Sequence, residues 1–400
     1  MSESSLNIQR LAVKLIPKAE RLIKQGHPWV FSDSITKINK EGRTGDLAII
    51  FDTKTNAPFA IGLYDDASPI RIKIISNQKE TIDAAFFKQK ISDAFDKRVS
   101  LLQTATTSYR LIFGENDHFP ALIADVYGTV LVVKLYSGIW FPYLDTIFPL
   151  LLEISSCETL VLRLSRNLQK NTTIYTDGMV VIGSLSQENV PFTEHGLHFE
   201  ANVIKGHKTG YFLDHKHNRK RVGAIAKSKT VLDVFSYAGG FSVHALAGGA
   251  KTVTSLDISE KALAVAKRNA SLNTFSGKHS IIAGDAFLKM KELIDNKQQY
   301  DIVIVDPPSF AKRASEVAAA LHSYERLIKL AIKLVAKNGI LVMASCSSRI
   351  SADEFFELVE RKLATSAYKW SVQEQTFHDI DHPITFPEGA YLKCGYYKRL

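Results

Sequence analysis

Four aspartates at the ends of predicted strands are the residues of this chain best placed to bind a ligand. They are Asp233, Asp257, Asp285 and Asp306. Because the carboxyl ends of parallel strands share one edge of a sheet, we expect them to line a single site. The spacing from Asp233 to Asp257 is close to the roughly 20 residues expected for an acid that binds a ribose. Asp285 can accept a hydrogen bond from an adenine amine, so the series predicts a nucleoside site.

A glycine turn follows the first of these strands, in the stretch DVFSYAGGF that contains Tyr237 and Gly239. Small residues there let the backbone approach a ligand closely, and a helix begins directly afterwards. The turn is not the GxGxxG fingerprint that a dinucleotide dehydrogenase needs for its diphosphate. The alternative, that the acids only cap helices, accounts for Asp285 alone better than for acids at successive strand ends.

Cys346 lies in a serine-rich loop after the fifth predicted strand, at the rim that also carries Asp306. A thiolate there can attack carbon 6 of a cytosine, which makes carbon 5 nucleophilic; exocyclic nitrogens need no such help. The alternative is a cysteine that packs at a strand end, and the polar loop argues against it. We expect Cys157 and Cys394 to be structural. With three cysteines and no CxxC pair, the sequence predicts a reducing cytoplasm and no zinc site.

The elements that position these residues alternate between apolar strands and helices from residue 229 onward. Nearly continuous apolar strands are typical of a parallel sheet buried on both faces, so we predict a doubly wound α/β domain. The predicted strands are 230–234, 252–257, 280–283, 301–305 and 339–344, with antiparallel strands at 371–377 and 391–397, and the predicted helices are 241–247, 260–273, 286–297, 317–336 and 352–364.

The first half of the chain has a different pattern. Residues 9–75 read as short strands broken by turn residues, with one short helix near 18–25, which predicts a small β-barrel. Helical and strand-like segments alternate from 80 to 182 and predict a central α+β domain. The predicted domains are 1–76, 77–195 and 196–400.

The formal net charge of +9 and the pI near 9.2 favour a polyanionic partner such as nucleic acid, although a merely basic enzyme is the alternative. Residues 205–221 hold six Lys or Arg against one Asp, with aromatic residues between them, a pattern that suits RNA. The alternative is a solvated helix start. We expect four of these cations to face RNA or support the site: Lys216, Arg219, Lys220 and Arg221. We see no acid or cysteine placed as a metal-ligand partner of the three histidines in this segment, so we predict no metal.

No apolar run reaches the length of about 18 residues that a membrane span needs, and the polar N-terminus does not suggest a secretory signal. The sequence leaves the oligomeric state open and is compatible with a homodimer.

The DPPSF stretch (306–310) and the SCSS stretch (345–348) together resemble the class I S-adenosylmethionine-dependent methyltransferases that act on cytosine carbon 5 of RNA. More narrowly, the whole chain is similar to bacterial large-subunit ribosomal RNA cytosine methyltransferases with an N-terminal PUA domain. The stretches GHPWVF (26–31), HKTGYFLDHKHNRK (207–220) and FPEGAYLK (386–393) support this.

The resemblance implies S-adenosylmethionine as cofactor, Cys346 as nucleophile and Asp306 as the group that orients the cytosine. It also implies that Phe212 and Asp214 close over the cofactor, that Phe310 offers a stacking face to the base, and that the PUA domain binds RNA. Many RNA cytosine methyltransferases carry a second cysteine in the Asp-Pro-Pro region, but this chain does not. The base that removes the carbon 5 proton is therefore left open between Asp306 and a water.

Two rival functions remain. Asp-Pro-Pro followed by an aromatic residue is also compatible with methylation of a guanine or adenine nitrogen, and Cys346 is the residue that discriminates. The second rival is an inactive RNA-binding assembly factor, against which the intact series of acids argues.

Overall fold

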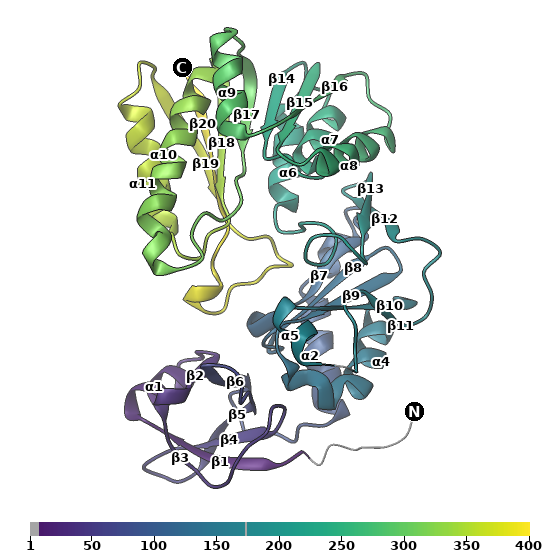
Figure 1. Ribbon diagram of the computed structural model, residues 1–400, viewed down its shortest axis with the longest axis vertical. Helices are drawn as coiled ribbons and strands as arrows, with labels where there is room; N and C mark the ends of the chain where they lie inside the picture. The colour runs from purple at the N-terminus through teal and green to yellow at the C-terminus, as the bar shows by residue number, and fades with distance from the viewer. Residues whose placement is uncertain (1–7, 173) are drawn as a thin grey trace. The chain divides into compact units, whose positions relative to one another are not determined.

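A computed structural model describes residues 8–172 and 174–400, and the chain divides into two compact units (Figure 1). The first unit extends to Thr193 and also contains Glu200–Leu213 and Ile380–Gly389. The second unit consists of Glu194–Phe199, Asp214–Asp379 and Ala390–Leu400. The predicted division into three domains at 76 and 195 stays a prediction.

A six-stranded sheet in the order β2-β6-β5-β4-β1-β3 opens the first unit. Side chains alternate between core and surface, and Leu11, Val13 and Ile72 belong to its fully buried core. The predicted small β domain with one short helix is confirmed, although two short strands were missed. Its elements are β1 Arg10–Leu15, α1 Pro17–Lys24, β2 Trp29–Phe31, η1 Ser32–Ser34, β3 Ile35–Ile38, β4 Leu47–Phe51, β5 Pro58–Tyr64 and β6 Ile70–Ser76.

A five-stranded sheet in the order β11-β10-β9-β8-β7 forms the rest of the first unit's framework. Helix α2 begins where Asp83 accepts a hydrogen bond from the Phe86 amide, and its apolar face packs into a core around Trp140. The central α+β arrangement is confirmed. Its elements are α2 Ala84–Asp96, α3 Val99–Leu102, β7 Ser108–Phe113, η2 Gly114–Asp117, β8 Leu122–Tyr127, β9 Val130–Leu135, η3 Gly138–Tyr143, α4 Leu144–Ser155, β10 Thr159–Leu164, α5 Arg166–Asn171 and β11 Met179–Ile182.

A seven-stranded sheet in the order β16-β15-β14-β17-β18-β20-β19 forms the second unit. Its first five strands are parallel, and β20 and β19 add antiparallel pairs, as predicted. The strands are β14 Thr230–Val234, β15 Thr252–Asp257, β16 Lys278–Ala283, β17 Tyr300–Val305, β18 Val335–Ser345, β19 Trp370–Thr376 and β20 Lys393–Arg399.

Helices α9 and α11 both pack on α10, while α6 and α8 flank α7, and Figure 1 shows these as two separate groups beside the sheet. Helix α11 begins with a capping box in which Ser351 and Glu354 exchange hydrogen bonds. The helices are α6 Lys216–Ile225, α7 Gly240–Ala247, α8 Glu260–Ser271, α9 Ala286–Asp295, α10 Val317–Leu334 and α11 Ala352–Ala364, with short 3-10 turns η4 Ala314–Glu316 and η5 Pro387–Gly389.

The strand order places the site at the middle of this sheet. Strand β14 lies between β15 and β17, so the connection reverses direction there, which is where doubly wound folds bind ligands. Val234 pairs with Val305, and Val305 pairs with Met343, so β14, β17 and β18 end at the same edge.

One two-stranded sheet was not predicted from the sequence. It is formed by β12 Asn189–Glu194 and β13 Leu197–Asn202. Among the helices in the described part of the chain, none is long and apolar enough to cross a membrane.

Candidate active site

The turn after β14 holds its backbone in an unusual conformation. Phe235, Tyr237 and Gly239 have φ angles of 64°, 46° and 75°. Left-handed conformations cost a non-glycine residue about 1–2 kcal/mol, and such strain gathers at functional sites. A Cβ atom at Gly239 would lie 2.8 Å from the Cβ atom of Ala266, so this position requires glycine. The turn points the Tyr237 amide at Asp257, whose Oδ2 atom accepts its hydrogen bond at 2.9 Å.

Asp233 has one satisfied and one unsatisfied carboxylate oxygen. Its Oδ2 atom accepts hydrogen bonds from the amide and hydroxyl of Ser242 at 3.1 and 2.7 Å. Within residues 8–172 and 174–400, its buried Oδ1 atom has no hydrogen-bond partner. Burial raises the pKa of Asp233 to about 7, and the nearby acids Asp306 and Asp257 add to the increase. A cationic ligand would supply the missing partner. The ammonium group of S-adenosylmethionine fits this requirement.

Asp285 acts as the cap of a helix. Its Oδ1 atom accepts a hydrogen bond from the Leu288 amide at 3.1 Å, at the start of α9. This is the alternative role that the sequence left open for it. Its predicted contact with an adenine stays a prediction.

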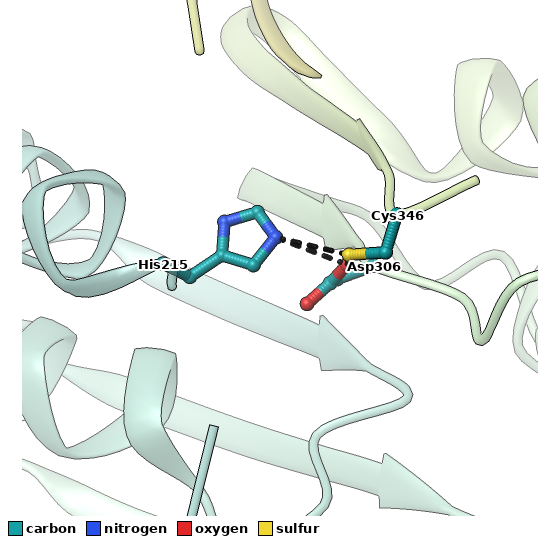
Figure 2. A group of neighbouring side chains, drawn as sticks. All are labelled: His215, Asp306 and Cys346. Carbon is teal, nitrogen blue, oxygen red and sulfur yellow. Dashed lines mark hydrogen bonds and ion pairs between the residues drawn. The ribbon is translucent and has the colours of Figure 1, made fainter. Parts of the chain in front are cut away.

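Cys346, Asp306 and His215 meet at the ends of β17 and β18 (Figure 2). The Sγ atom of Cys346 lies 3.7 Å from Oδ1 of Asp306 and 3.6 Å from Nε2 of His215. The same Asp306 oxygen lies 3.4 Å from Nε2 of His215. Cys346 is partly exposed and Asp306 is 22% exposed, so a substrate can reach both. The structure therefore brings together the two residues predicted to be catalytic.

His215 is a member of this group that the sequence did not reveal. Burial alone lowers the pKa of His215, but the neighbouring carboxylates Asp306 and Asp214 outweigh it and leave the pKa raised. The Asn218 amide lies 3.1 Å from Nδ1, and its oxygen accepts hydrogen bonds from the hydroxyls of Thr376 and Tyr396. With Asn218 assigned as donor by this network, the proton of a neutral His215 lies on Nε2, facing Cys346 and Asp306. The feature of the sequence that could have pointed to His215 is its position directly after Asp214, a residue predicted to close over the cofactor.

The ligand atoms of His215, Asp306 and Cys346 lie within 4.8 Å of one another. The sequence argument against a metal assumed that the histidines of 205–221 had no acid or cysteine nearby, and for His215 that assumption is wrong. We assign no metal to the group, because a thiol, a carboxylate and an imidazole in mutual contact are also what an activated cysteine requires. The absence of a metal stays a prediction.

Two of the four cations predicted to face RNA or support the site are buried instead of exposed. The guanidinium of Arg219 makes two 2.6 Å hydrogen bonds to Glu194, and Lys216 is 0% exposed. Glu194 also contacts His244 at 2.9 Å. Although burial raises the pKa of Glu194, the Arg219 guanidinium and the hydrogen bond with His244 outweigh it and lower the pKa. Residues three positions apart share a helix face, and this face of α6 is turned inward. In this structure the side chains of Lys216 and Arg219 are buried, which leaves support of the site as their predicted role. Lys220 and Arg221 are exposed, and RNA contact stays a prediction for them.

The two residues predicted to close over the cofactor belong to different units. Phe212 lies in the first, where the Lys208 ammonium is 5.5 Å from its ring centre. Asp214 lies in the second, and its Oδ2 atom accepts a hydrogen bond from the Tyr391 hydroxyl at 2.9 Å. Phe310 is partly buried, with its ring 5.2 Å from that of Tyr324 in an edge-on arrangement. The cofactor and base contacts of these residues stay predictions.

Family comparisons agree with this geometry. Residues 110–387 match the family described as S-adenosylmethionine-dependent methyltransferase, and residues 13–77 match the PUA-like domain. The ribosomal RNA large subunit methyltransferase of Deinococcus radiodurans is 39% identical over 403 residues, covering 98% of each chain. Ribosomal RNA large subunit methyltransferase I of Klebsiella pneumoniae is 32% identical over 380 residues, or 94% of each chain.

Two solved structures share the fold over nearly the whole length. A SAM-dependent methyltransferase structure from Streptococcus mutans has a TM-score of 0.81 at 21% identity and covers 97% of this chain and 99% of its own. SMU.776, a methyltransferase structure complexed with SAH, has a TM-score of 0.82 at 22% identity, with 98% and 100% covered. At these identities the likeness shows the fold alone.

Proposed function

The chain belongs to the S-adenosylmethionine-dependent methyltransferases, and we propose that within this family it methylates carbon 5 of a cytosine in large-subunit ribosomal RNA. The observation that carries the choice of atom is the contact of the Cys346 thiol with Asp306 and His215 at the ends of the central strands. Methylation of an exocyclic nitrogen does not require a nucleophilic cysteine at this position.

Three observations support ribosomal RNA as the substrate. The names of both relatives specify the large ribosomal subunit. The net charge of +9 suits a polyanion. The match to a PUA-like domain supports the proposal that residues 1–76 form a domain that binds RNA. In this proposal a central domain and then the methyltransferase domain, from residue 196 onward, follow it in the sequence. We expect Lys220, Arg221 and Phe310 to contact the substrate, and an enzyme of ribosomal RNA is expected in the cytoplasm.

The cofactor is S-adenosylmethionine, which supplies an electrophilic methyl group when it is bound. Asp233 meets its positive charge through the unsatisfied Oδ1 atom. The turn with Tyr237 and Gly239, which directly follows β14, would hold its methionine part, and Asp257, which accepts a hydrogen bond from the Tyr237 amide, would bind the ribose hydroxyls. Three further contacts are part of the proposal, from Phe212, Asp214 and Asp285.

The chemistry starts at Cys346. The thiol gives its proton to a neighbouring acceptor, for which Asp306 is suited because its Oδ1 atom already faces Sγ. The electron pair of sulfur forms a bond to carbon 6 of the cytosine, and the electrons of the ring double bond become available at carbon 5. Carbon 5 then carries both the methyl group and a proton. A water, or Asp306 once it has passed its proton to solvent, takes that proton, and the electrons of the C–H bond restore the ring double bond and expel the thiolate from carbon 6. Asp306 orients the ring, and Nε2–H of His215 stabilises the thiolate by hydrogen bonding.

The deciding experiment compares base-resolved methylation of ribosomal RNA from cells with and without this protein. We expect one 5-methylcytosine of the large-subunit RNA to disappear, and to return with the wild-type chain but not with Cys346→Ala. Cys157→Ala, which removes a buried thiol of the first unit, is the matched control and should restore the mark.

Loss of a methyl group from a guanine or adenine nitrogen, or normal methylation by Cys346→Ala, would overturn the proposal. If no mark disappears and calorimetry detects no S-adenosylmethionine binding, the chain is an RNA-binding assembly factor instead.

A further inference from the structure

The FPEGAYLK stretch ends at a lysine that is buried beside the nucleophile loop. Lys393 is the first residue of β20, where it pairs with Ser345 of β18, the residue before Cys346. Its relative exposure is 2%. Lysine is almost never fully buried without partners, so the contacts of its ammonium group indicate what it does.

All three hydrogen-bond acceptors of Lys393 are backbone carbonyls. Its Nζ atom donates to the oxygens of Ser347 and Ile350 at 2.5 Å each, and to that of Tyr391 at 3.2 Å. Ser347 and Ile350 belong to the connection that leaves Cys346 and leads to α11. The ammonium group thus joins the two ends of the turn that directly follows Cys346.

The charge of Lys393 is also directed at this turn. Burial lowers the pKa of Lys393 to about 8 even though its interactions with Cys346 and Glu354 act to raise it. Electrostatic interaction is mutual, so an ammonium that gains from the Cys346 thiolate also stabilises that thiolate. Three carbonyl dipoles keep the charged form favourable in the buried site.

We propose that Lys393 is a positioning residue for Cys346, which fixes the loop from 346 to 350 through its carbonyls and supplies the positive charge that favours the reactive thiolate. This inference rests on the proposed function, because it takes Cys346 to be the nucleophile. A lysine that only fills space would stabilise the fold but leave the reactivity of the thiol unchanged.

The test measures how fast iodoacetamide alkylates Cys346 in the full chain near neutral pH, with the modified peptide identified by mass spectrometry. Lys393→Gln removes the charge and keeps donors for the carbonyls, whereas Lys393→Met keeps the length and removes both. Two neutral variants keep the test decisive if one of them does not fold. We expect each to slow alkylation about tenfold, the effect of one pKa unit. Lys393→Arg should stay within about threefold of wild type because it restores a charged donor.

Controls separate positioning from folding. S-adenosylmethionine affinity in the folded variants should stay within about threefold of wild type. Lys398→Gln makes the same change near the partly exposed end of β20 and should alter nothing. Single-turnover methylation should fall about tenfold or more in the neutral variants.

Wild-type alkylation in a folded neutral variant would overturn the inference, as would an arginine variant as slow as the neutral ones. Alkylation needs no RNA, so this result is independent of the methylated atom. If Cys346→Ala methylates normally while Lys393→Gln slows alkylation, the proposed function fails and the influence of Lys393 on the thiol stands.

Discussion

The Nε2 atom of His215 lies 3.6 Å from the Sγ atom of Cys346, although 131 positions separate the two residues in the sequence. The contact forms because α6 begins beside the ends of β17 and β18, where Asp306 and Cys346 also lie. With Nδ1 facing the Asn218 amide, the imidazole offers its Nε2–H to a thiolate. A hydrogen bond to a charged group is roughly twice as strong as one between neutral groups, so this contact favours the reactive form of Cys346.

Replacing His215 should therefore slow the reaction of Cys346. His215→Ala is expected to reduce single-turnover methylation about tenfold to a hundredfold, in the range typical of a lost hydrogen bond to a developing charge. His215→Gln keeps a donor and should retain more activity than the alanine variant. His322→Gln, at a histidine whose side chain is 71% exposed, is the control. Equal rates for His215→Ala and wild type would exclude this role.

The buried ion pair of Arg219 and Glu194 predicts an effect on stability. Removing Arg219 leaves the buried Glu194 carboxylate with its contact to His244 but without the guanidinium, and breaking a buried pair costs up to about 3–5 kcal/mol. We expect Arg219→Gln to lower the urea midpoint of the second unit markedly. The unfolding of this unit should be measured with a spectroscopic probe placed in it, because a chain of two units need not unfold in one step. Lys220→Gln, on the exposed face of the same helix, should leave the midpoint nearly unchanged. A stable, fully folded Arg219→Gln protein would show that the pair contributes little.

Lys220 and Arg221 are the two cations of α6 that we still expect to contact RNA. Both are exposed, and Arg221 makes a 2.8 Å surface ion pair with Glu374 that RNA phosphates can replace. The double variant Lys220→Gln, Arg221→Gln should weaken RNA binding and reduce the slope of log K against log salt by about 1.5, the contribution of two phosphate contacts. The same neutralisation at Lys261 and Lys267, exposed on α8, is the control. An unchanged salt slope in the first variant would remove α6 from the RNA interface.

Most of the second unit could be predicted because its pattern is local. Buried parallel strands must be apolar along their whole length, and β14 and α11 have the predicted bounds. The grouping of the aspartates at one site could be predicted because the carboxyl ends of parallel strands meet at one edge of the sheet. The short strands β2 and β3 were missed because three or four residues give too little alternation, and β12 contains Pro191, which argues against a strand.

The environment of individual side chains could not be predicted, since it depends on distant residues. The segment from 205 to 221 looks uniformly basic, yet Glu194 pairs with Arg219 and one face of α6 is buried. Charge composition cannot show which face of a helix is turned inward. In the same way, no local pattern indicates that His215 meets Cys346 or that Lys393 reaches the carbonyls of Ser347 and Ile350.

Asp233 predicts how cofactor affinity depends on pH. Burial raises the pKa of its carboxyl to about 7 in the free protein, with further increases from Asp306 and Asp257. A cationic cofactor binds the ionised form, so below this pKa binding must first expel a proton. Affinity for S-adenosylmethionine should therefore rise about tenfold per pH unit as the pH approaches about 7 from below, and level off above it. Calorimetry in buffers of different ionisation enthalpy should detect the released proton.

The contribution of Asp233 to the stability of the fold depends on pH in the opposite direction from its contribution to cofactor affinity. Because the folded pKa of Asp233 lies above its ordinary value of 3.8, the stabilisation from the neutral carboxyl is fully present below that value and is lost as the pH rises through about 7. Asp233→Asn removes the titration from both measurements: its weaker cofactor binding should be independent of pH in this range, and its stability should fall less between acid and neutral pH. Asp301→Asn, a partly exposed acid in the same sheet that accepts hydrogen bonds from Thr230, is the control and should keep the wild-type pH dependence. If Asp233→Asn keeps the same rise in affinity as wild type, the titrating group is another one and Asp233 does not meet the positive charge of the cofactor.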